Sequence, residues 1–167
     1  MRIGGAGQSS VNILESEAGA FRGRDFAVSQ NRCFVGRVVQ TAVAGQFSRC
    51  QIFNPAGSGI TLILDRIVVS YSSQVNFSIE HYDTELTTDV GAWLSKALGG
   101  AAGACHLRRD TGTANQGTML EFYYRSANNP EQIEYKYPYM LDAGEGLHVE
   151  RAVANTELDV NFYGREV

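Results

Sequence analysis

The chain is poor in lysine, histidine and cysteine, and it has little charge. Its 167 residues include 2 Lys, 3 His and 3 Cys, charged residues make up 19% of the total, and the net charge is −4. A protein dedicated to duplex nucleic acid usually carries a basic excess, so this composition argues against a nucleic-acid partner. Arginine supplies 12 of the 14 basic residues. Arginine suits packed, planar contacts at interfaces, although a GC-rich genome would give the same bias.

The few cysteines exclude two kinds of site. Cys33, Cys50 and Cys105 are odd in number, widely spaced and without a CxxC motif. We therefore expect neither a disulfide framework nor a structural zinc site, but free thiols in a reducing compartment. The N-terminus, MRIGGAGQSS, lacks the apolar core of a signal peptide, and no stretch approaches the ~18 apolar residues of a membrane span. These absences predict a soluble chain, with no membrane partner, that is assembled in a cytoplasm.

The length suits one domain, with a different segment in front of it. Hydrophobic residues make up 44%, which is enough for a core. Residues 1–30 are Gly/Ser-rich at first and then carry scattered apolar side chains without a sustained period. We interpret residues 1–30 as an extended arm that docks outside its own domain, and residues 31–167 as a β-sandwich domain. The alternative for the first segment is a disordered terminus.

Strand-like patterns dominate from residue 32 onwards. They are separated by turn signals about every 8–12 residues and occupy 32–40, 46–53, 60–71, 74–82, 104–109, 118–126, 133–141, 146–153 and 157–164. Alternation places two apolar rows in the core, with the intervening polar residues outward. The rows are Val75, Phe77 and Ile79, and Leu158, Val160 and Phe162. The last two strands are expected to face each other across residues 154–156, with Leu147, Val149 and Val153 in a matching row.

One stretch departs from the strand pattern. In residues 83–98, Thr88 is placed to cap a short helix that carries Val90, Leu94 and Ala97 on one side and ends before Gly99. With at most one short helix and eight or nine strands, the sequence predicts an all-β fold, an antiparallel sandwich or barrel. Eight strands suit a jelly roll, so we expect a jelly-roll-like antiparallel β-sandwich with an extended N-terminal arm.

Motifs for enzymatic chemistry are missing or weak. A cupin holds its metal with clustered His and Glu, but no HxH motif occurs among His81, His106 and His148. Asp110-Thr111-Gly112 matches the DTG of aspartic proteases, yet polar residues surround it and favour a turn over residues 110–117. The sequence 80–83, EHYD, is expected at a solvated strand end. We therefore predict a protein that is not an enzyme and has no cofactor and no metal.

Aromatic residues suggest contact surfaces instead. In residues 134–140, Tyr135, Tyr137 and Tyr139 share one strand face, which serves as core, as a protein interface or as a sugar-binding platform. A second aromatic run is EFYYR, residues 121–125. In the arm, two Phe side chains beside two Arg could anchor on a partner and pair with its carboxylates. The candidate interface residues are Phe21, Arg22, Arg24, Phe26, Tyr135, Tyr137 and Tyr139.

Two segments resemble small structural proteins of tailed bacteriophages. They are CQIFNPAGSGITLILDRIVVS (50–70) and the C-terminal stretch 137–167, which has a Gly-x-Gly-Leu turn, Ala-Asn-Thr and a last alternating strand. The resemblance implies a jelly-roll virion component assembled in the host cytoplasm. Such a decoration, or cement, protein binds and bridges the major capsid protein and is expected to be a dimer or a trimer. Two alternatives are a tail-fibre or baseplate module that binds a host receptor or glycan, and a cupin-like or hydrolytic enzyme, which the missing ligand set disfavours.

Overall fold

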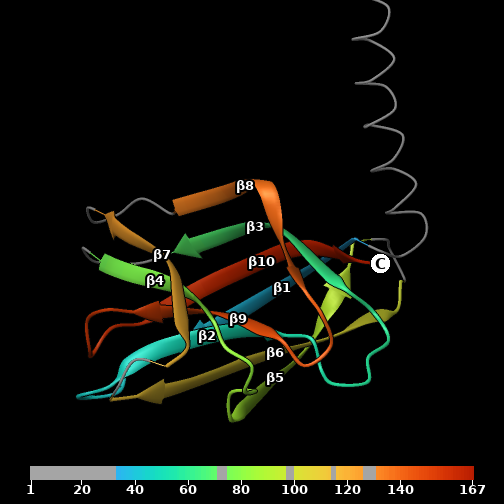
Figure 1. Ribbon diagram of the computed structural model, residues 1–167. Helices are drawn as coiled ribbons and strands as arrows, with labels where there is room; N and C mark the ends of the chain where they lie inside the picture. Colours follow the sequence, from blue (N-terminus) through green and yellow to red (C-terminus); the bar gives the residue numbers. More distant parts are fainter. Residues whose placement is uncertain (1–32, 71–74, 97–99, 114–115, 126–130) are drawn as a thin grey trace, which may run out of the picture.

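Strands make up all the regular structure of the described residues. The computed structural model describes residues 33–70, 75–96, 100–113, 116–125 and 131–167 (Figure 1), so the predicted arm over residues 1–30 lies outside them. The strands are β1 (Cys33–Gln40), β2 (Phe47–Phe53), β3 (Leu62–Ser70), β4 (Val75–His81), β5 (Thr88–Ser95), β6 (Ala102–Gly112), β7 (Thr118–Arg125), β8 (Glu131–Leu141), β9 (Gly146–Arg151) and β10 (Leu158–Glu166). The all-β prediction is confirmed.

All ten strands belong to one antiparallel sheet. Their order is β7-β4-β9-β2-β6-β5-β1-β10-β3-β8. The sheet curls into a half-barrel, so that β1 and β10 lie against β2 although they are not its neighbours in the order (Figure 1). The two halves therefore pack face to face in the manner of a sandwich. The turn of the sheet lies at β5, which pairs with β1 through only Phe34–Ser95 and Val35–Leu94.

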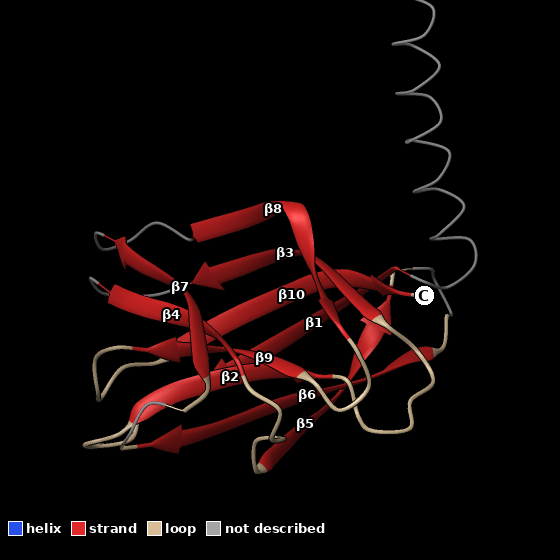
Figure 2. Cartoon of the chain, viewed as in Figure 1, coloured by secondary structure: helices blue, strands red, loops and turns tan. Residues whose placement is uncertain are grey.

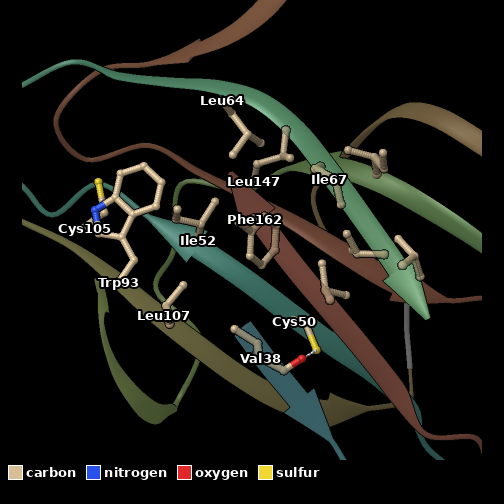
Figure 3. Close-up of a cluster of buried hydrophobic side chains, with 14 of the residues drawn as sticks. Val38, Cys50, Ile52, Leu64, Ile67, Trp93, Cys105, Leu107, Leu147 and Phe162 are labelled. Carbon is tan, nitrogen blue, oxygen red and sulfur yellow. Dashed lines mark hydrogen bonds between the residues drawn. The ribbon is translucent and has the colours of Figure 1, made fainter. Parts of the chain in front are cut away.

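The core lies between the two halves and follows the predicted alternation. Leu158, Val160 and Phe162 of β10 and Phe77 and Ile79 of β4 are fully buried. The third residue of the predicted β4 row is Val75, and its side chain lies outside the described residues. Figure 3 shows the surrounding cluster, and its labelled members come from seven strands: Val38, Cys50, Ile52, Leu64, Ile67, Trp93, Cys105, Leu107, Leu147 and Phe162. Burial of each large side chain is worth about 1.5–3 kcal/mol.

The helix expected within residues 83–98 is wrong. Residues 88–95 form β5, in which Gly91 has φ +117°, a conformation that a helix does not contain. The face selected from the sequence is inverted as well, because Val90 and Leu94 are exposed whereas Trp93 is fully buried and stacks on Phe34. The single tryptophan decides which face of the segment turns inward. The last residue of the predicted helical face, Ala97, lies outside the described residues.

Two predicted connections are also wrong. Strands β9 and β10 do not face each other as a pair: β9 lies between β4 and β2, and β10 between β1 and β3. Val153, expected in the core row, is 46% exposed. Residues 110–112 are not a turn, because they continue β6 and pair with β2. Alternation identifies the face of a strand but not its partner or its end, and those depend on tertiary contacts.

Candidate interaction surface

The outer face of β4, β9 and β2 is polar but covered. Sequence analysis placed the polar residues of β4 outward, and they do point away from the core. They are nevertheless buried, with Ser78 4% exposed and Glu80 1%. The solvated strand end predicted for residues 80–83 is therefore wrong for Glu80, although Asp83 is exposed. The segment 82–87 lies across this face. Gln51 holds it by donating to the carbonyl oxygens of residues 82 and 84 and by accepting from the main-chain N–H of Leu86.

A row of alternating charges crosses three strands of this face. Arg49 of β2 lies opposite Glu150 of β9 on one side and Asp110 of β6 on the other. Its Nε donates to Glu150 Oε2 at 2.5 Å, and its Nη1 lies 3.6 Å from Asp110 Oδ1. Burial raises the pKa of both carboxyl groups, and the Arg49 charge opposes that rise. The row therefore contains a guanidinium on which two buried carboxylates depend.

The neighbouring row brings together a serine, a carboxylate and a histidine. Ser78 Oγ donates to Glu80 Oε1 at 2.6 Å, and Glu80 Oε2 lies 3.2 Å from His148 Nε2. Burial acts to raise the pKa of Glu80, but the hydrogen bonds from His148 and Ser78 outweigh it, so that the pKa lies below its ordinary value. This is not a nucleophile triad, because the serine contacts the acid and not the imidazole base. The arrangement stabilises the sheet rather than activating a hydroxyl.

The described residues contain no group of three or more His, Cys, Asp or Glu side chains that could hold a metal ion. His106 pairs with Glu85, and His81 lies near Asp83, each at the surface. The first contact joins the middle of β6 to the segment 82–87, and the second lies at the end of β4.

Strand β7 carries an exposed apolar surface at one edge of the sheet. Figure 2 shows β7 beside β4 at that edge. Its outward face lies opposite Asn76, Ser78 and Glu80 of β4, and a register shift between Ile79 and Glu80 leaves Leu120 as an extra residue. We call the exposed side chains of this strand the β7 patch: Met119 (51% exposed), Leu120 (42%), Phe122 (51%) and Tyr124 (69%). Apolar residues gathered along an edge are typical of a contact surface.

The two edges of the sheet differ in how they discourage pairing with another chain. Natural edge strands are protected by Lys, Pro and charge. The β8 edge, EQIEYKYPYML, contains Lys136 and Pro138 together with two acidic residues. The β7 edge, TMLEFYYR, contains neither Lys nor Pro, and its acid Glu121 is engaged by Tyr139. A partner strand is therefore better accommodated at β7 than at β8.

The residues selected from the sequence fall outside this patch. Phe21, Arg22, Arg24 and Phe26 lie outside the described residues, and Tyr135 and Tyr137 lie in β8 with side chains that are not described.

Tyr139 is half-buried against the core, and its hydroxyl donates to Glu121 Oε1 at 2.7 Å. Burial raises the pKa of this phenol. Tyr139 thus links β8 to β7. The sequence did contain the signal for the patch, since EFYYR alternates Phe122 and Tyr124 against Glu121, but nothing in it marks β7 as an edge.

The described residues include no helix that is long and apolar enough to cross a membrane. No protein-family model, curated protein or solved structure matches the chain.

Proposed function

We propose that this chain is a non-enzymatic virion protein that decorates the head of a tailed bacteriophage. It binds the major capsid protein and bridges neighbouring subunits. The observation that carries the proposal is the β7 patch, four exposed apolar side chains along a sheet edge that contains neither Lys nor Pro. The resemblance of residues 50–70 and 137–167 to phage structural proteins gives the setting.

A decoration protein needs a stiff body, and the fold provides one. The core between the two halves and the covered charge row on the outer face fix β4, β9, β2 and β6 relative to one another. Edge strand β7 is attached to that body through its full pairing with β4 and through the stacking of Tyr123 on Phe77. The patch is thus presented on a rigid support, so that little conformational entropy is lost on docking.

Binding then requires burial of apolar area and no chemistry. A fully buried Phe or Met side chain contributes roughly 1.5–3 kcal/mol, and the patch residues are already partly covered, so each contributes less. One patch gives a weak contact, and many copies on a symmetric shell give a strong one through avidity. In the proposed complex, Phe21 and Phe26 of the arm add apolar contacts, and Arg22 and Arg24 pair with capsid carboxylates.

The first experiment counts copies. Particles produced from the genome that encodes this chain are purified, and the chain is quantified by mass spectrometry relative to the major capsid protein. Decoration predicts a ratio near that of the capsid protein. A few copies per particle would favour the alternative, a tail-fibre or baseplate module in which exposed Phe122 and Tyr124 stack on a glycan of the host surface. Absence from the particles refutes both.

The second experiment tests the patch. Particles that lack the protein are titrated with the wild type and with the Phe122→Ser/Tyr124→Ser variant. We expect the variant to bind about 10- to 100-fold more weakly, which corresponds to about 1.4–2.8 kcal/mol. The matched control is Val43→Ser/Val153→Ser, which removes exposed apolar side chains elsewhere. Equal binding by all three proteins would show that β7 is not the docking surface. Circular dichroism verifies that each variant is folded.

A further inference from the structure

The β7 patch is small for a separate partner protein. It offers parts of four side chains on one eight-residue strand, whereas a stable interface buries about 800 Å² on each partner. The extra residue Leu120 also interrupts the regular edge, which limits rigid pairing with the edge of a second sheet. A segment tethered to the same chain has no such size requirement, because tethering gives it an effective concentration in the millimolar range.

We propose that, in the free protein, residues 11–21 of the N-terminal segment pack on the β7 patch of their own chain. This inference goes beyond the proposed function and does not depend on it. The described chain begins at Cys33 in β1, which leaves 32 residues before it. That length selects the N-terminal segment as the occupant.

The segment is long enough to reach the patch. In the strand order β1 and β7 are six neighbours apart, which is about 29 Å across the sheet at ~4.8 Å per strand. By register, Cys33 also lies about eight residues, or ~26 Å, along the strands from Met119, the nearest patch residue, so that the two displacements combine to about 39 Å. Phe21 precedes Cys33 by 12 residues, which span up to about 40 Å when extended. Val11, Ile13 and Leu14 have more chain still. Val11, Ile13 and Leu14 can therefore lie anywhere on the patch without strain in the connecting residues, whereas Phe21 reaches its near end, at Met119, with an extended connection.

The chemistry of the two surfaces matches. Val11, Ile13, Leu14 and Phe21 are apolar side chains without a regular period of their own, and the patch gives them apolar contacts. The free edge of β7 can also offer main-chain groups to an extended segment, as in β-strand addition. Occupation by the segment covers an edge strand that contains neither Lys nor Pro. On the proposed particle the arm leaves β7, so that both surfaces become available to the capsid.

Hydrogen–deuterium exchange on the full-length free protein tests this inference. We expect amides in residues 11–21 to exchange at least about tenfold more slowly than in an unstructured peptide. In Phe122→Ser/Tyr124→Ser they should exchange at the unstructured rate. In the matched control Leu94→Ser/Met140→Ser, which alters equally exposed apolar residues on β5 and β8, protection should persist. Unprotected amides in the wild type, or protection that survives loss of both aromatics, overturn the proposal.

Dilution distinguishes the chain's own segment from that of a second copy. Intramolecular packing predicts protection that is independent of protein concentration and cross-links only within one chain in a mixture of isotope-labelled and unlabelled protein. Protection that falls on dilution, or cross-links between labelled and unlabelled chains, overturns the same-chain assignment in favour of exchange between copies. Because these measurements involve no particles, their failure leaves the decoration function standing, and failure of particle binding leaves this inference standing.

Discussion

Replacement of Arg49 by Met tests the charge row on the outer face of the sheet. The side chains of Arg49 and Glu150 are each only 2% exposed, and the bond between them is 2.5 Å long. Asp110, 3.6 Å from the same guanidinium, loses its cation in the same variant. Arg49→Met therefore leaves the fully buried Glu150 and the largely buried Asp110, whose side chain is 15% exposed, without this positive partner.

The expected cost follows from the burial. Removal of one partner from a buried ion pair destabilises a protein by about 3–5 kcal/mol, because the remaining charge is uncompensated. With a urea m-value of about 2 kcal/mol/M, the unfolding midpoint should fall by about 1.5–2.5 M. The deficit should shrink as the pH is lowered, since the pKa of Glu150 is already raised by burial and protonation removes its unpaired charge.

The assay is urea unfolding followed by Trp93 fluorescence and by circular dichroism, with coincident transitions as the check on two-state behaviour. The matched control is Arg37→Met. Arg37 also makes a two-bond contact, with Asp159, but its side chain is 64% exposed, and we expect the midpoint to stay close to that of the wild type. If Arg49→Met shifts the midpoint no further than Arg37→Met does, the argument from burial is refuted.

Three further predictions concern other parts of the sheet. The folded-state pKa of Glu80 lies below its ordinary value of 4.5, so its contribution to stability is present above that value and is lost as the pH falls through the folded pKa. In urea titrations between pH 6 and 3, Glu80→Gln should therefore lose less free energy of unfolding than the wild type does, and an equal loss contradicts this. Cys33 is half-buried, whereas Cys50 and Cys105 are buried and have raised pKa values. Ellman's reagent should therefore react quickly with one thiol in the native protein and with three in urea, and three fast thiols in the native protein would contradict the burial. Gly103→Ala would place a methyl group against the indole nitrogen of Trp93. We therefore expect the free energy of unfolding to fall by about 1–3 kcal/mol and the tryptophan emission to change, and wild-type values of both would count against the packing.

The sequence was most informative where one face of a strand meets the core. Alternation identified Phe77 and Ile79 as buried, because only one of the two faces can pack against the other half of the sheet. It could not predict the burial of Glu80, since that burial comes from the segment 82–87, which crosses the outer face. It misassigned residues 88–95 because Val90 and Leu94 look like a helical stripe, whereas the packing of Trp93 determines the fold of that segment.

The candidate surface was harder to predict than the core. The run of aromatics around Phe122 is visible in the sequence, but the same pattern would suit a central strand. Its exposure depends on β7 being the last strand of the order, and that is a property of the whole topology. Tyr139 shows the converse. It was selected as a possible contact residue, yet the curl of the sheet brings its hydroxyl to Glu121 on the opposite edge.

The position of β10 has a consequence for synthesis of the chain. This last strand pairs along its length with β1 on one side and β3 on the other, and Arg165 lies opposite Cys33. Until β10 has been synthesised, β1 and β3 have no strand between them, and for β1 the missing partner is more than one hundred residues away along the chain. Folding dominated by such distant pairings is slow. The nascent chain should therefore need protection by chaperones until β10 has emerged from the ribosome, and a truncation before Leu158 should yield a chain that chaperones capture rather than a smaller folded domain.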